Sequence, residues 1–383
     1  MRLMRDPYED IEIAPSFMVH FVGGIHVIMP TSLPHDVFLY DGQGVLRSAT
    51  AQATGEVIFP FYWLEDWRVV IKRDGAHVYE HRFNPSGQRV LVSIGSSSMG
   101  DTLAWVPYLE NFQQRWGCKV VACSHHNEWV ESAYPSIEWI GPGVEVKNIY
   151  ALTNIGFFYD ESEESLPDPT KHSHDPRTEP LQWTAARQLG LPPVEIRPRV
   201  SISTRGRPVD DHYVCLGIHS TSQAKYWNHP SGWDEVTSWL KSRGYRVFIA
   251  SREEDGFMGN RLPADAERLP DYQIETTATF ICHADAFIGV GSGLTWMAWA
   301  LETPTVLVSG FSHPWTEMSE AVKVSAPDNV CAGCFNRHRI QANDWQWCPD
   351  RKGTSRQFEC SRSITPEKVI SAFQQCIDEG HIS

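Results

Sequence analysis

Four cysteines near the C-terminal end have the spacing of metal ligands. Cys331, Cys334, Cys348 and Cys360 form the pattern C-x2-C-x13-C-x11-C in a polar, arginine-rich segment. A pair separated by two residues closes a small chelate, and two later thiolates complete a tetrahedron. Four thiolates suit zinc or iron, and zinc is the usual ion in closed four-cysteine sites. The spacing alone therefore favours structural zinc at 331–360 over four buried apolar cysteines.

An acidic residue follows the first strongly apolar run. RVLVSIG (89–95) has the pattern of a buried strand, and SSSMGD brings Gly100 and Asp101 to the start of a helix. Aspartate is a common N-cap, and the pattern alone favours that interpretation. The functional alternative is a general base, because an inverting sugar transfer needs a carboxylate to accept the proton of the attacking hydroxyl.

A lysine lies in a hydroxyl-rich loop after another predicted strand. HSTSQAKYWN (219–228) surrounds Lys225 with Ser220, Thr221 and Ser222. A mobile ammonium with several hydroxyl donors suits a diphosphate. A solvated lysine is the alternative, but the apolar and aromatic neighbours favour a binding role.

A glycine-rich turn opens a later helix in GVGSGLTWMAWALETP (289–304). Glycines let a backbone approach a phosphate, and the free N–H groups of a helix start bind anions. A tight strand-to-helix connection without any ligand explains the same pattern. This motif therefore supports phosphate binding without establishing it.

The elements that must position these residues alternate between strand and helix. Predicted strands are 89–95, 118–124, 136–141, 148–156, 212–220, 245–251, 285–290 and 303–310, and later helices are 231–244, 275–284 and 291–302. Such alternation predicts two parallel α/β units, with ligands bound beyond the carboxyl ends of the strands. The acidic, proline-rich stretch 160–180 is expected to be a long loop beside the cleft.

The first 86 residues differ, because they contain short runs rich in Val, Ile and aromatics. DGQG (41–44) and DGAH (74–77) separate these runs as hairpin turns would. We therefore predict three domains: an N-terminal β domain at 1–86, an N-terminal α/β domain on the acceptor side at 87–205, and a donor-binding C-terminal α/β domain at 206–383.

Composition narrows the class of protein. A net charge of −14 argues against nucleic-acid binding, because phosphate backbones attract basic surfaces. No apolar run approaches the roughly 20 residues of a membrane span, and MRLMRDPYED (1–10) has no signal-peptide core. We expect a cytoplasmic protein, in which the nine cysteines are not disulfides.

Taken in order, the motifs resemble the bacterial autotransporter heptosyltransferases, which are protein O-heptosyltransferases. The resemblance covers roughly residues 86–375 and rests on SMGDTLAW (98–105), STSQAKYWNHPSGWDEV (220–236), GSGLTWMAWAL (291–301), VLVSGFS (306–312), CAGC (331–334), WCP (347–349) and RQFEC (356–360). It implies a GT-B type glycosyltransferase with two facing Rossmann-like domains, a small N-terminal β domain and a metal-bound four-cysteine C-terminal segment. The implied reaction moves heptose from ADP-heptose to serine, with threonine as an alternative, on an autotransporter adhesin.

The same resemblance assigns roles to individual residues. Asp101 matches the catalytic acid of the family, and Lys225 the lysine that contacts the donor phosphates. The implied donor-binding set also contains Thr221, Ser292, Gly293, Leu294 and Thr295. The family implies one iron on the four cysteines, in place of the zinc that spacing favours, and a homo-oligomer, a dodecamer.

Three alternatives stay open at this point, and one of them is a transferase that uses a different donor such as a UDP-hexose, because no residue separates adenine from uracil. Another is a lipopolysaccharide-core heptosyltransferase, whose helix-start motif is similar but has an Asp ahead of it and a His following it. Gly291 and Trp296 occupy those places here, which weakens this alternative. The third is a non-catalytic scaffold module with a structural zinc site.

Overall fold

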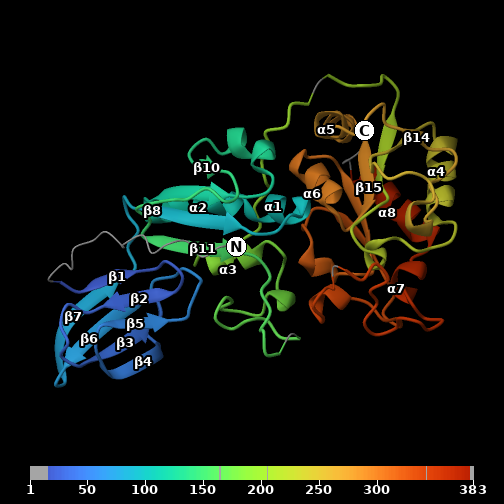
Figure 1. Ribbon diagram of the computed structural model, residues 1–383. Coiled ribbons are helices and arrows are strands. Elements are labelled where there is room, and N and C mark those ends of the chain that lie inside the picture. Colours follow the sequence, from blue (N-terminus) through green and yellow to red (C-terminus); the bar gives the residue numbers. More distant parts are fainter. Residues whose placement is uncertain (1–15, 164, 205, 342, 380–383) are drawn as a thin grey trace.

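The computed structural model describes residues 16–163, 165–204, 206–341 and 343–379. Within these residues the strands form two small antiparallel sheets followed by two parallel sheets (Figure 1). The antiparallel part lies at one end of the molecule, and the two parallel sheets lie side by side beyond it.

The N-terminal part is the predicted β unit. One sheet contains β1 (Met18–His20), β2 (Ile25–Ile28) and β5 (Glu56–Phe59), and the other contains β4 (Leu46–Ala53), β3 (His35–Tyr40), β6 (Arg68–Arg73) and β7 (Ala76–Arg82). Asp74 and Gly75 join β6 to β7 with φ of 50° and 79°. A type I′ hairpin turn needs positive φ at both central positions, so the predicted DGAH turn is confirmed.

The first parallel sheet follows directly. Its strand order is β10 (Glu138–Ile140), β9 (Lys119–Cys123), β8 (Arg89–Ile94) and β11 (Ala151–Ile155). The chain leaves β8 through α1 (Met99–Trp105) and α2 (Pro107–Trp116), while α3 (Trp183–Gln188) packs on β11. Asp101 therefore lies in the first turn of α1, just beyond the carboxyl end of the buried strand β8.

The second parallel sheet is larger. Its order is β14 (Glu267–Arg268), β13 (Arg246–Ile249), β12 (Tyr213–Gly217), β15 (Ala286–Val290), β16 (Thr305–Ser309) and β17 (Val322–Ser325). Every residue of β12, β15 and β16 is buried, as expected for parallel strands covered on both faces.

Helices cover both faces of this second sheet. Val236 of α4 (Gly232–Ser242) and Phe373 of α8 (Pro366–Asp378) belong to one hydrophobic cluster. Ile281 of α5 (Ile274–His283) and Met297 of α6 (Gly293–Ala300) belong to another. The predicted α/β alternation is confirmed, whereas β17, α8 and the short α7 (Glu359–Arg362) were not anticipated.

The two parallel sheets are joined where α1 packs against α6. Leu181 donates its backbone N–H to the carbonyl of Thr316 at 2.9 Å, which ties the two α/β units at a second point. One hydrophobic cluster runs from the β unit through both parallel sheets. The domain limits at 86 and 205 therefore stay a prediction.

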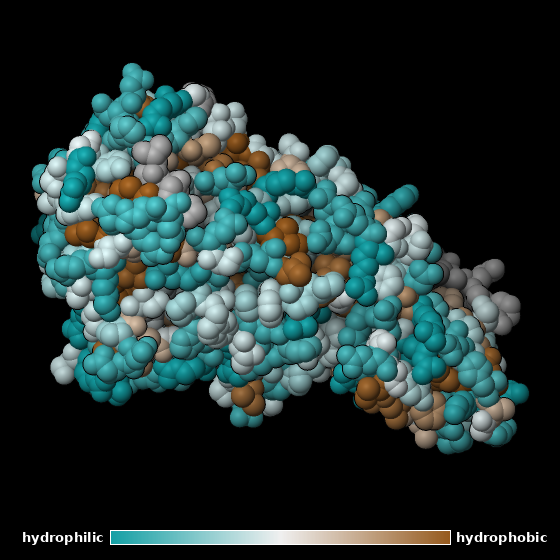
Figure 2. All heavy atoms as spheres, turned by 180° about the vertical axis from the view of Figure 1, so that it is seen from behind, coloured by the Kyte–Doolittle hydropathy of each residue, from teal (hydrophilic) through white to brown (hydrophobic). Residues whose placement is uncertain are grey.

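Figure 2 shows the opposite face as mostly hydrophilic, with small apolar groups scattered over it. The N-terminal β unit carries several of the exposed large apolar side chains, namely Leu33, Val45, Leu46, Ile58 and Val78. None of the helices in the described part of the chain combines the length and the apolar character needed to cross a membrane.

Candidate active site

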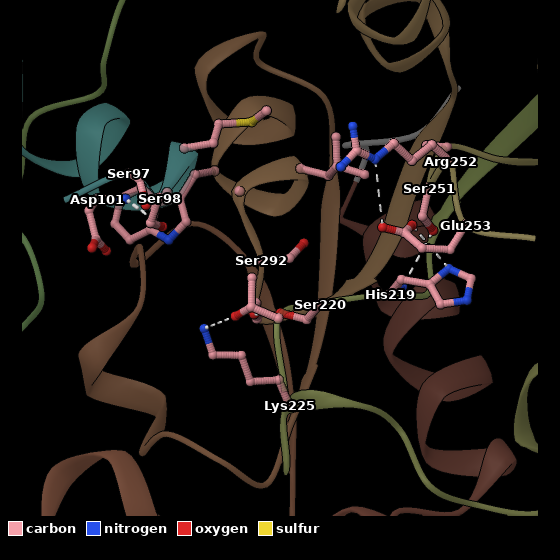
Figure 3. Close-up of a pocket in the computed structure, with 18 of the residues that line it drawn as sticks. Ser97, Ser98, Asp101, His219, Ser220, Lys225, Ser251, Arg252, Glu253 and Ser292 are labelled. Atoms are coloured by element: carbon pink, nitrogen blue, oxygen red, sulfur yellow. Dashed lines mark hydrogen bonds and ion pairs between the residues drawn. The ribbon is translucent and has the colours of Figure 1, made fainter. Parts of the chain in front are cut away.

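A cavity of about 780 Å³ lies between the two parallel sheets. Its walls come from the segments that follow the carboxyl ends of β8, β12, β13 and β15. Figure 3 shows Ser97, Ser98 and Asp101 on one wall and His219 and Glu253 at the other end. This is the place where open parallel sheets bind ligands.

Asp101 is not the N-cap that the local pattern favours. Ser98 caps α1, because its Oγ accepts a hydrogen bond from the backbone N–H of Asp101 at 3.4 Å. The carboxylate of Asp101 is free to line the cavity, where Ser96 Oγ donates to it at 2.5 Å. Burial raises the pKa of Asp101, while the Ser96 hydrogen bond and the charge of Lys225 oppose that rise.

Lys225 reaches the cavity from a short 3-10 turn, Gln223–Lys225, that follows β12. Its Nζ lies 3.4 Å from Thr221 Oγ1 and 5.4 Å from the centre of the Phe311 ring. Burial lowers the pKa of Lys225, and the carboxylates of Asp101 and Glu317 act in the opposite direction. Lys225 is half-buried and lines the cavity, where the charge of its ammonium acts on a bound anion.

Glu317 is a cavity residue that sequence reasoning missed. It lies in the loop after β16, and its Oε1 accepts a hydrogen bond from Ser312 Oγ at 2.7 Å. Burial raises the pKa of Glu317, opposed by Ser312 and Lys225. A Cβ added to Gly291 would lie 3.8 Å from Glu317 Oε1. The carboxylate therefore lies close to Gly291, a placement that no local motif reveals.

The start of α6 presents backbone and one hydroxyl to the cavity. Ser292, Gly293 and Leu294 line it, and the buried Oγ of Ser292 has no hydrogen-bond partner among the described residues. Thr295 differs, because its side chain is buried and its hydroxyl donates to the carbonyl of Val290 at 2.6 Å. The structure brings every other predicted catalytic or donor-binding residue to the cavity, namely Asp101, Thr221, Lys225, Ser292, Gly293 and Leu294.

The end of the cavity farthest from Asp101 contains residues that the sequence did not single out. His219 is buried, and its Nδ1 lies 3.6 Å from Glu253 Oε2. Arg252 Nε lies 3.9 Å from the other carboxylate oxygen of Glu253 (Figure 3). Burial lowers the pKa of His219, which favours a neutral ring. A carboxylate acceptor beside aromatic side chains such as Tyr272 suits a nucleoside.

The cysteine segment lies beside this cavity. Cys331 Sγ, Cys334 Sγ and a carboxylate oxygen of Asp350 all lie within 4.8 Å of one another. Cys348 and Cys360 are buried in the same segment, but they are not part of that compact group. Burial raises the pKa of Cys334 to about 12 and that of Cys360 to about 11, and repulsion from the neighbouring cysteines, when ionised, adds to each rise.

A bound cation would relieve this repulsion, so the donor set fits a thiolate-binding metal. Asp350 was not anticipated as a neighbour of the two cysteines. The four-cysteine ligand set predicted from spacing therefore stays a prediction.

The sequence of this chain is similar to those of known glycosyltransferases. Residues 178–342 match the model of glycosyltransferase family 9 (heptosyltransferase). The autotransporter heptosyltransferase TibC of Escherichia coli O78:H11 is 35% identical over 91% of this chain and 87% of its own length. The autotransporter heptosyltransferase Aah of Escherichia coli is 35% identical over 74% of this chain and 73% of its own.

The structure of this chain is also similar to solved glycosyltransferase structures. Iron-containing dodecameric TibC from enterotoxigenic E. coli superimposes with a TM-score of 0.84 at 30% identity, covering 95% of this chain and 96% of that one. TibC in complex with ADP-D-β-D-heptose superimposes with a TM-score of 0.83, at the same identity and coverage. The predicted α/β glycosyltransferase fold is confirmed.

Fold and cavity together define a glycosyltransferase. The chain belongs to the autotransporter heptosyltransferase family, on identity above 30% across most of the length of its relatives. It is thus a heptosyltransferase enzyme, and the alternative of a non-catalytic scaffold is not supported.

Proposed function

We propose that this protein transfers heptose from ADP-heptose, with inversion, to serine hydroxyls of an autotransporter adhesin, with threonine as an alternative acceptor. One observation carries the proposal. Asp101 and Lys225 follow strands of different sheets, yet both line one cavity at the start of α6. TibC, which is known in complex with ADP-D-β-D-heptose, supports the choice of donor.

The donor would lie along the cavity in a defined order. Its adenosine part fits between His219 and Tyr272, with Glu253 accepting hydrogen bonds from ribose hydroxyls. Its diphosphate fits beside Lys225 and the backbone N–H groups at the start of α6, with Ser292 as an added hydroxyl donor. The heptose then reaches the end where Asp101 and Glu317 lie.

The transfer itself requires one proton acceptor and one stabilised leaving group. As the acceptor oxygen forms its bond to the anomeric carbon, the proton of the hydroxyl moves to Asp101, and the bond to the diphosphate breaks. Lys225 and the α6 N–H groups stabilise the negative charge that develops on the departing ADP. Removing such a base or donor typically lowers the rate by roughly 10²–10⁴.

We also propose one iron ion on Cys331, Cys334, Cys348 and Cys360, with zinc as the alternative. The gathered thiols and the iron content of TibC support this assignment. A bound ion would crosslink a segment that has little regular structure of its own. A dodecameric assembly, as in TibC, belongs to the same proposal, and the cytoplasmic location stays a prediction.

The decisive experiment measures the intact mass of a purified autotransporter passenger after incubation with this enzyme and ADP-heptose. The expected result is a mass increase by whole heptose units, mapped to serine-containing peptides. Parallel reactions with a UDP-hexose and with a lipid A–sugar acceptor test the other donor and the other acceptor. Transfer to the lipid-linked acceptor alone would contradict the proposal.

A further inference from the structure

A second, smaller cavity of about 340 Å³ adjoins the active-site cavity. Trp296, Thr316 and Glu317 line both cavities, so they meet at the end of the site that holds Glu317. Neither His219 nor Glu253, at the nucleotide end, lines the second cavity. We call this second cavity the side cavity, and it begins where the sugar of the donor would end.

Aromatic residues and prolines form much of its wall. Trp183, Trp296 and Trp315 line it together with Pro180 and Pro314. Trp315 is 43% exposed, and it is the only exposed tryptophan in the chain, because all fifteen lie among the described residues. Tryptophan is enriched among the residues that dominate binding energy, so an exposed one beside a reaction centre indicates a binding surface.

The side cavity is held in shape by hydrogen bonds between the two α/β units. Leu181 N–H donates to the carbonyl of Thr316 at 2.9 Å. Ser319 N–H donates to Glu195 Oε2 at 2.7 Å, again across the junction. A site built on such fixed segments binds a ligand without first having to order its own walls.

The charges of the side cavity narrow the class of ligand. Glu195 and Glu317 line it with Lys323 as the single basic residue, so its formal charge is negative when both carboxylates are ionised. An anionic lipid-linked sugar would meet unfavourable charges there. An uncharged polypeptide segment would not meet such repulsion.

We infer that the side cavity binds the acceptor polypeptide next to the hydroxyl that is modified, with Trp315 and Trp183 as its main contacts. This inference rests on the proposed function, because it assumes a protein acceptor. The order along the molecule is then nucleotide, diphosphate, heptose and polypeptide, so the acceptor hydroxyl reaches Asp101 from the side away from the nucleotide.

The test compares Michaelis constants for the two substrates in the full-length enzyme. Trp315→Ala and Trp183→Ala are each expected to raise the KM for a purified autotransporter passenger at least about tenfold more than the KM for ADP-heptose. Phe257→Ala, at the nucleotide end of the main cavity, is expected to show the opposite preference. Val144→Ala removes a comparably exposed apolar side chain away from both cavities and serves as the matched control.

The results distinguish failure of the proposed acceptor site from failure of the proposed function. If the wild-type enzyme modifies the passenger but both tryptophan variants change its KM by less than twofold, the side cavity is not the acceptor site. If the wild-type enzyme modifies only the lipid A–sugar acceptor, the proposed protein acceptor fails and this inference with it. Thermal unfolding of each variant shows that it is folded, and Trp183→Phe replaces Trp183→Ala if the latter does not fold.

Discussion

Gly293 at the start of α6 lies directly against Met99 at the start of α1. A Cβ at position 293 would lie only 2.6 Å from Met99 Cβ, and one at Gly100 would lie 3.6 Å from the Cα of Gly293. Two helices that begin in different α/β units therefore touch through their first residues. This contact sets the distance between Asp101, the proposed general base on α1, and the start of α6, where we propose that the diphosphate binds.

The first prediction concerns that contact. Gly293→Ala is expected to force the two helices apart, because backbone and Cβ atoms cannot give way as a flexible side-chain end can. Overpacking of this kind costs about 1–3 kcal/mol of unfolding free energy. We expect a lower melting temperature and a fall in kcat larger than the change in ADP-heptose KM. Gly95→Ala, where a Cβ meets nothing within 4 Å, is the control and should leave stability nearly unchanged.

The second prediction concerns Asp101. Asp101→Asn is expected to lower kcat by roughly 10²–10⁴ while the enzyme stays folded. Because a general base acts when ionised and burial raises the pKa of Asp101, the rate should fall as pH decreases through a value above that of an ordinary aspartate. Near wild-type transfer by the folded variant would remove the base role. Asp265→Asn, at an exposed position, controls for general charge effects.

The third prediction follows from the charge of Lys225. That charge lowers the pKa of Asp101, so Lys225→Met should move the acid limb of the pH–rate profile to higher pH. The same change should raise the KM for ADP-heptose, because an ammonium is lost beside the diphosphate. A profile that keeps its midpoint would show that Lys225 and Asp101 are not coupled in the working enzyme.

The fourth prediction concerns the metal ligands. We expect elemental analysis of enzyme purified without added metal to find iron, and we expect Cys348→Ser and Cys360→Ser to lose it. Asp350→Asn should retain iron if four cysteines hold it, although this carboxylate lies within 4.8 Å of Cys331 and Cys334. If Asp350→Asn loses iron and Cys348→Ser retains it, Asp350 is a ligand in place of Cys348, and the four-cysteine set is wrong. Cys118→Ser, just before β9 and far along the chain from the cysteine segment, is the control.

The fifth prediction is a pH dependence of stability at His172. Burial lowers its pKa to about 4, and its Nε2 accepts a hydrogen bond from Phe158 N–H at 2.9 Å. The unfolded chain takes up this proton near pH 6.5 and the folded chain only near 4, so unfolding free energy should fall as pH drops between these values.

The size of this effect is on the order of 3 kcal/mol. Urea unfolding at several pH values measures it. His172→Gln should flatten the dependence, whereas His125→Gln, at an exposed position, should not.

Periodicity and turn chemistry predicted the α/β part well, because its strands are continuous apolar runs and its helices have clear starts. The runs RVLVSIG (89–95) and DAFIGV (285–290) became β8 and β15. The amphipathic α8 has an equally clear pattern, although it lies outside the predicted helices. The predicted strand 136–141 contains β10, whereas the two-residue edge strand β14 has too little local signal to be predicted.

The site could be predicted only in part. Asp101, Lys225 and the start of α6 lie directly after strong strands, so their position at the sheet edge followed from the sequence. Glu317 and Glu253 lie in irregular segments, and only the tertiary fold brings them to the cavity. Thr295 is the opposite case. It matches the predicted binding motif, but its hydroxyl donates a hydrogen bond to the backbone carbonyl of Val290.

The cysteine segment has one more consequence. Cys334, Cys348 and Trp347 pack in one cluster with Ala224, the residue before Lys225, and with Phe311, whose ring lies beneath the lysine ammonium. The surface beneath Lys225 and the cysteine segment are therefore packed as one unit. A truncated chain that ends before residue 331 would keep Asp101, Lys225 and Phe311 but lose Cys334, Trp347 and Cys348, which pack against Phe311 and Ala224. The smallest active unit of this enzyme must include its tail.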